Sequence, residues 1–160
     1  MMFTIFSLRN STPFESEERE AILRVIDDYC RTSAGEWLRN FPYRRFAFHW
    51  CAAMSDEVMG AFVPAAPWTI FLMPCAENGT TFSRTTWAEI IAPTAIHELR
   101  HAWQFRKCWW LYVLCSLPIL RQFTLERDAT RIGNAAAEII EKTVAWHDAR
   151  RFARRWKREE

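Results

Sequence analysis

His97-Glu98-Leu99-Arg100-His101 is the stretch of this chain from which both a fold and a chemistry can be predicted. On an α-helix, positions i and i+4 lie about 40° apart around the axis and about 6 Å apart along it, so His97 and His101 can bind one metal ion from the same face. Glu98 lies beside this pair, where its carboxylate could take a proton from a metal-polarised water. The pattern indicates a zinc hydrolase. The alternative is an amphipathic helix that carries two histidines and a glutamate by chance.

The neighbouring residues favour a helix here. Pro93 suits a first helical turn, where its missing N–H costs nothing. The segment from Thr94 to Arg106 contains no Gly or Pro, so we predict a helix over it. Its packing surface would come from apolar side chains at helical spacing, namely Ile96, Leu99, Ala102, Trp103 and Phe105.

A zinc enzyme needs a third protein ligand and an open fourth position. Glu126, which opens a second predicted helix, is the candidate, since small residues follow it at helical spacing and would let the two helix backbones approach closely. The alternative is a solvated charge cluster at a helix start. Asp128 is a rival ligand, but it lies about 200° from Glu126 on a helix, so only one of the two can face the metal. The small residues are Ala129, Gly133 and Ala136 or Ala137.

The segment His97-Glu98-Leu99-Arg100-His101-Ala102-Trp103-Gln104, followed by Leu125-Glu126-Arg127-Asp128-Ala129, resembles the gluzincin metallopeptidases, and among them the small bacterial and phage members. The resemblance covers roughly residues 85 to 140. It implies zinc bound by His97, His101 and Glu126, with Glu98 as general base and acid. It also implies a zincin fold, in which a small sheet packs on the active-site helix.

Two departures from the family pattern concern the residues that support the metal ligands. Asp128 stands where many relatives have Glu, and Thr130 stands where Asp or Asn is common. The partner that orients a ligand histidine is therefore not identified by the motif. In zincins the edge strand of the sheet holds the substrate as an added strand. Our candidate for that edge is Thr69 to Met73, with an interior strand as the alternative.

The remaining pattern predicts an α+β fold with a sheet of three to four strands. A helix is expected over Ser16 to Arg31 with Ser16 as its cap, and Thr86 to Ala92 is ambiguous between a strand and a helical lead-in. A long helix is expected from Leu125 to about Trp156, with a weak point at Gly133-Asn134. Strands are expected over Arg44 to Cys51, Val58 to Val63 and Thr69 to Met73.

Composition and length fit a single domain over residues 1–160, with its zinc-binding half at about 85–140. Half of the residues are hydrophobic, which excludes a disordered chain, and a net charge of +2 with no specific motif does not indicate nucleic acid. Five dispersed cysteines indicate reduced thiols. Met1 to Phe14 lacks the basic region of a signal peptide, so we expect a cytoplasmic location, or virion association for a phage protein.

The apolar segment Cys108 to Leu120 is too short to span a bilayer. We predict that it is a buried connector that caps the cleft. The alternatives are that Trp109 and Trp110 dock to a membrane surface or to a protein assembly, with help from the basic segment Arg150 to Arg158. Tyr112 is a candidate donor to the oxyanion. Two further histidines are less suited: His147 would lie far along the last helix, and His49 is expected in the core or at a sheet edge.

Two functions follow from these patterns. The first is a zinc-dependent peptidase that acts on a peptide or protein substrate. The second is a non-catalytic assembly component, such as a virion protein, that keeps a zincin fold and its zinc. An intact Glu98 favours the enzyme, because a structural zinc site needs no carboxylate beside its open position.

Overall fold

The computed structural model describes residues 11–51, 60–73, 84–115, 124–140 and 142, and shows an α+β fold. Helices and strands occur in the following order: β1 (Thr12–Pro13), α1 (Ser16–Cys30), the short 3-10 helices η2 (Glu36–Leu38) and η3 (Tyr43–Arg45), β2 (Ala47–Trp50), β3 (Gly60–Phe62), β4 (Thr69–Leu72), α2 (Arg84–Lys107), α3 (Trp109–Cys115) and α5 (Leu125–Ile140).

The four described strands form one mixed sheet in the order β1-β2-β4-β3. β2 and β4 run parallel with Phe48 opposite Ile70, whereas β1 pairs antiparallel with β2, and β3 pairs antiparallel with β4. The predicted edge strand is therefore wrong, because Thr69–Leu72 lies inside the sheet. Beyond β4, the described sheet ends with β3, which is therefore the edge strand there. Sequence order misled the prediction, since the strand nearest to α2 in the chain is not the outermost one.

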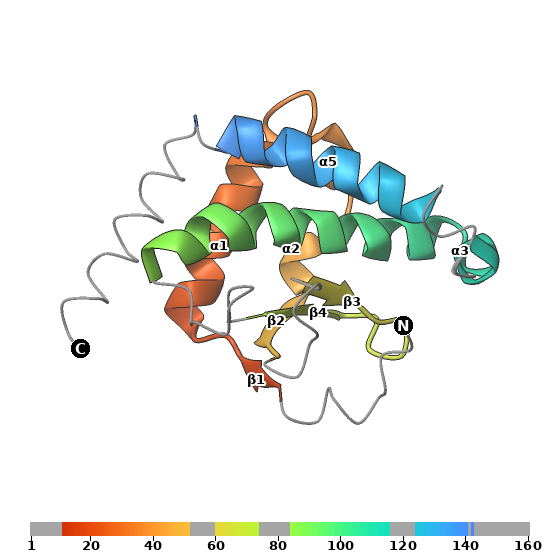
Figure 1. Cartoon of the computed structure of the whole chain (residues 1–160), viewed down its shortest axis with the longest axis horizontal. Coiled ribbons are helices and arrows are strands. Elements are labelled where there is room, and N and C mark those ends of the chain that lie inside the picture. The colour runs from red at the N-terminus through yellow and green to blue at the C-terminus, as the bar shows by residue number, and fades with distance from the viewer. Residues whose placement is uncertain (1–10, 52–59, 74–83, 116–123, 141, 143–160) are drawn as a thin grey trace.

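Helix α2 is the central element of the molecule, with the sheet along one side and α5 along the other (Figure 1). The main core lies where α1, α2 and one face of the sheet meet. It includes the fully buried side chains Ile22, Ile26, Phe48, Ile70, Leu72, Ile91, Ile96 and Leu99. Phe71 and Met73 point to the other face of the sheet, where they pack with Cys51 and Ala61. Both faces of β4 are thus apolar, which explains its lack of alternation.

The beginnings of two helices differ from the sequence prediction. Helix α2 begins at Arg84, so Thr86 to Ala92 is helical and Pro93 lies inside the helix. An internal proline costs about 3 kcal/mol, and here the burial of Ile91 and Ala92 opposes that cost. At α1, the cap is Glu15 rather than Ser16, and the Glu18 carboxylate accepts the N–H of Glu15 at 2.9 Å.

The segment that follows α2 is not the buried connector that we expected. Trp109 and Trp110 are 64% and 58% exposed, and Leu111 and Val113 are exposed as well. The helix α3 is apolar along all seven of its residues, but it buries only part of its surface against α2, and Tyr112 is its side chain that packs against the core. Residues 116–120 of this segment lie outside the described residues.

Helix α5 continues through Gly133 without a break and ends at Ile140, so the expected weak point is wrong. His147, Arg150 to Arg158 and the rest of the predicted long helix lie outside the described residues. Among the helices that the structure describes, none combines the length and the apolar character needed to cross a membrane.

Candidate metal centre

Three side chains from two helices converge on one point between α2 and α5. His97 and His101 lie one turn apart on α2, and Glu126 reaches them from the first turn of α5. One potential ligand atom from each of the three lies within 4.8 Å of the others. The convergence predicted from the HExxH spacing and the downstream glutamate is therefore present.

The spacing of these atoms matches the donor set of a tetrahedral zinc ion. The two Nε2 atoms of His97 and His101 lie 3.1 Å apart, and each lies 3.4 Å from Oε2 of Glu126. Ligands that bind zinc tetrahedrally at about 2.0–2.1 Å lie about 3.3 Å from one another. Two imidazoles and a carboxylate at these separations fit three corners of such a site. No displacement of either helix is needed to bring them there.

The close approach of α5 to α2 is what brings Glu126 into reach. Ala129, Gly133 and Ala136 are buried on the face of α5 that meets α2. A Cβ atom on Gly133 would lie 3.3 Å from the Cβ atom of His97, which is tighter than ordinary van der Waals contact. The predicted stripe of small residues is present, and at its third position the buried residue is Ala136.

Glu98 lies between the ligand histidines and the sheet edge. Its side chain is buried, with Oε2 accepting the backbone N–H of Phe62 in β3 at 2.7 Å and Oε1 lying 3.9 Å from Nε2 of His97. Burial raises the pKa of Glu98, and the nearby His101 and His97 act in the opposite direction without cancelling that rise. A carboxylate of raised pKa beside a metal site is suited to accept a proton and return it. The bond to β3 was not predicted.

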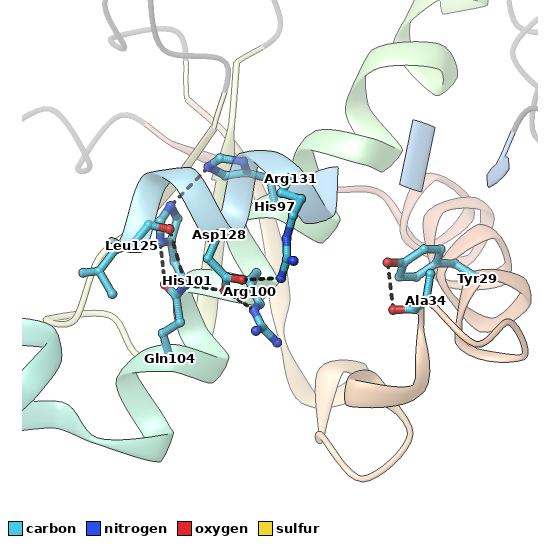
Figure 2. A network of polar contacts seen from close by, with 9 residues as sticks. All are labelled: Tyr29, Ala34, His97, Arg100, His101, Gln104, Leu125, Asp128 and Arg131. Atoms are coloured by element: carbon cyan, nitrogen blue, oxygen red, sulfur yellow. Dashed lines mark hydrogen bonds and ion pairs between the residues drawn. The ribbon is translucent and has the colours of Figure 1, made fainter. Parts of the chain in front are cut away.

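The orientation of His101 depends on Gln104, a residue that the sequence analysis did not assign (Figure 2). Nδ1 of His101 lies 3.0 Å from Oε1 of Gln104, and the Gln104 amide donates to Oδ2 of Asp128 at 3.0 Å and to the carbonyl of Leu125 at 3.3 Å. Burial lowers the pKa of His101, but the Glu126 and Glu98 carboxylates outweigh it, so the pKa is raised. The signal that could have found Gln104 is its i+3 position after His101 on the same helix.

Asp128 does not join the cluster of ligands. Its carboxylate accepts from Nε of Arg100 at 2.7 Å and from Arg131 at 3.1 Å. Burial alone would raise the pKa of Asp128, but the hydrogen bond and charge of Arg100 outweigh it, and the pKa is lowered. The rival ligand is thus turned away from the histidines, as its position on the helix implied.

Tyr112 and His49 complete the set of candidate residues. The ring of Tyr112 lies edge-on to that of His101, with centroids 6.4 Å apart, and it also contacts Phe62 and Phe105. Its ring therefore lies beside the site, and its role as oxyanion donor stays a prediction. His49 lies in β2, where it contacts Ser11 at 3.1 Å and packs against Phe71, and burial lowers its pKa. It is a structural histidine of the sheet.

None of the known protein-family models, curated proteins and solved structures matches this chain. The residues of the site and the distances between them are therefore what indicate its chemistry.

Proposed function

We propose that this chain is a zinc-dependent peptidase with a zincin-like arrangement of the gluzincin type. The observation that carries the proposal is the triangle of His97, His101 and Glu126 ligand atoms, with side lengths of 3.1, 3.4 and 3.4 Å. A structural zinc site is closed by four protein ligands, whereas a catalytic one has three and keeps a position open. The described residues contribute three ligands at this point.

The residues around the triangle have the chemistry that peptide hydrolysis needs. Zinc, when bound, would supply Lewis acidity, which polarises a carbonyl and lowers the pKa of a water. Glu98 is placed to accept the proton of the attacking water and to pass it to the leaving amine. The hydroxyl of Tyr112 would stabilise the oxyanion that develops.

The substrate would lie along β3, the edge of the described sheet beside α2. An extended peptide can add to such an edge through backbone hydrogen bonds, while side-chain pockets select it. The N–H of Phe62 is bound to Glu98, which ties this edge to the proton acceptor, so an added strand would use the other backbone groups of β3. The same two elements, β3 and α2, would then determine both the alignment of the substrate and the transfer of the proton.

The test compares the parent with Glu98→Gln and His97→Ala in zinc content and in hydrolysis of a fluorogenic casein. We expect about one zinc per parent chain and hydrolysis that a chelator abolishes. Glu98→Gln should keep the zinc but lose hydrolysis, because an amide cannot take the water's proton. His97→Ala should lose both. A parent without bound transition metal, or equal metal content in the two variants, would contradict the proposal.

The exposed tryptophans favour a second candidate, a non-catalytic assembly component that uses zinc to hold α2 and α5 together. Trp109 and Trp110 expose apolar surface on α3, the helix whose Tyr112 contacts His101, and such a surface suits docking onto a larger structure. This function predicts a zinc-loaded parent that hydrolyses nothing and a Glu98→Gln variant that behaves like it.

A further inference from the structure

We propose that Asp128 is a positioning residue for the ligand His101, and that it acts through Gln104. The inference rests on the metal site of the proposed function, but not on the peptidase activity. It assigns a purpose to three polar residues, Asp128, Gln104 and Arg100, that lie outside the ligand set. They form a continuous chain of contacts that ends on the imidazole of His101.

The hydrogen-bond types along this chain select one tautomer of His101. Both acceptors near the Gln104 amide nitrogen, the Asp128 carboxylate at 3.0 Å and the Leu125 carbonyl at 3.3 Å, cannot donate. The NH2 group of Gln104 must therefore face them, which turns Oε1 towards His101. Since Oε1 only accepts, Nδ1 of His101 must carry the hydrogen. In the neutral imidazole, its Nε2 atom is then left with the lone pair that a metal requires.

Without Asp128, only the Leu125 carbonyl at 3.3 Å would accept from the Gln104 amide, so the amide would rotate by half a turn more readily. The NH2 group would then face Nδ1 of His101, and the hydrogen of a neutral imidazole would move to Nε2. That form cannot bind a metal through Nε2. The carboxylate of Asp128 excludes it, because an ionised carboxylate accepts hydrogen bonds but never donates them.

Asp128 is itself held firmly by Arg100. The Arg100 guanidinium donates to Oδ2 at 2.7 Å and packs over the rings of Trp103 and Trp37, with its central carbon 4.1 and 5.0 Å from their centroids. Cation–π contacts of this kind restrict the guanidinium. Arg100, which lies farthest from the metal ligands in this series of contacts, is thus held in place by Trp103 and Trp37.

This series of contacts crosses the interface between α2 and α5, as the metal ligands do. His101 and Gln104 lie on α2, whereas Leu125, Glu126 and Asp128 lie on the first turn of α5. Docking of α5 therefore delivers the third ligand and sets the tautomer of His101 in one step. The two residues of α5 that looked like rivals for the metal have complementary tasks.

The test measures zinc affinity by chelator competition and the His101 tautomer by 15N NMR of the imidazole in the metal-free protein, at a pH at which that imidazole is neutral. The variants are Gln104→Met, Asp128→Ala and the double variant, with Arg131→Ala as the control, because Arg131 is an exposed partner of Asp128. We expect parent and control to show the Nδ1–H form. Both single variants should show mixed tautomers and a zinc affinity about 10-fold to 100-fold lower. The double variant should bind zinc no more weakly than Gln104→Met, since Asp128 acts through Gln104.

Fully additive losses in the double variant, or an unchanged tautomer in Asp128→Ala, would overturn the proposal. A rescue experiment does not depend on the folding of Asp128→Ala. Gln104→Glu places a second carboxylate against that of Asp128 and should weaken zinc binding. Adding Asp128→Asn supplies an amide that can donate to the new carboxylate and should restore zinc binding in part. If zinc binding is not restored, the proposed series of contacts is wrong. A parent that binds zinc without hydrolysing peptides would refute the proposed function alone. If no variant bound zinc, the tautomers would still decide the inference.

Discussion

Glu126 and Asp128 lie two residues apart at the start of α5, yet their carboxylates have different partners. Glu126 lies 3.4 Å from each ligand imidazole, and Asp128 lies 2.7 Å from Arg100. About 200° of helical rotation separates the two positions, so the backbone alone sends them to opposite sides. Which of the two faces the histidines was decided by the small residues that follow Glu126 on its face.

This difference predicts unequal losses of metal. Glu126→Ala removes a ligand and should abolish zinc retention during gel filtration. Asp128→Ala leaves all three ligands in place, so the protein should still take up one zinc when zinc is in excess, with lower affinity. Glu138→Ala, an exposed carboxylate on the same helix, is the control and should match the parent. Loss of all zinc from Asp128→Ala, with full retention by Glu126→Ala, would reverse the assignment of the third ligand.

Among the helices and strands, the contact between α2 and α5 is the one that brings Glu126 to His97 and His101. Gly133→Val places a branched side chain where even a single Cβ atom would lie 3.3 Å from His97. We expect α5 to be pushed from α2, which moves Glu126 from the imidazoles and lowers zinc affinity at least 10-fold. Asn134→Val introduces the same residue on the exposed face and should leave the affinity unchanged. Equal zinc affinity in the two variants would show that the site does not depend on this contact.

A second link joins η3 to α1 and gives the fold a pH dependence. The Tyr43 hydroxyl donates a hydrogen bond to Asp27. The pKa of Tyr43 is raised, mainly by burial and in addition by this hydrogen bond. Its contribution to stability is present below the ordinary tyrosine pKa of about 10 and is lost as pH rises above it, because only the unfolded chain then ionises.

Tyr43→Phe should therefore lower the free energy of unfolding by about 1–2 kcal/mol at pH 7. The variant should also lose less stability than the parent between pH 9 and pH 11. Urea unfolding at several pH values measures both effects. A parent and a variant with parallel pH curves would contradict the assignment.

For the molecule as a whole, a metal bound by residues of both α2 and α5, as proposed, would couple metal binding to stability. Zinc at about 100 times its Kd would add about 2.7 kcal/mol to the free energy of unfolding. In a domain of this size that corresponds to a rise in Tm of about 5–10 °C. Calorimetry with zinc and after chelation measures the shift. Glu126→Ala should show no zinc-dependent change, and a parent equally stable with and without zinc would contradict the coupling.

The parts of the site that could be predicted depend on short separations along the chain. The i, i+4 spacing of His97 and His101 places both imidazoles on one face of any helix. The residues that follow Glu126 at intervals of three or four show its helix face in the same way. The α+β class was predicted from local patterns as well, and the structure confirms it.

The parts that only the folded chain reveals depend on residues far apart in sequence. Strand order places β3 rather than Thr69–Leu72 at the edge beside α2, and the bond from Phe62 to Glu98 follows from that order. Pro93 lies inside α2 because the burial of its neighbours opposes the local cost of proline. Likewise, the contact of Asp128 with Gln104 requires α5 to dock on α2. Local spacing sets which side chains share a face, but only packing between elements sets what that face meets.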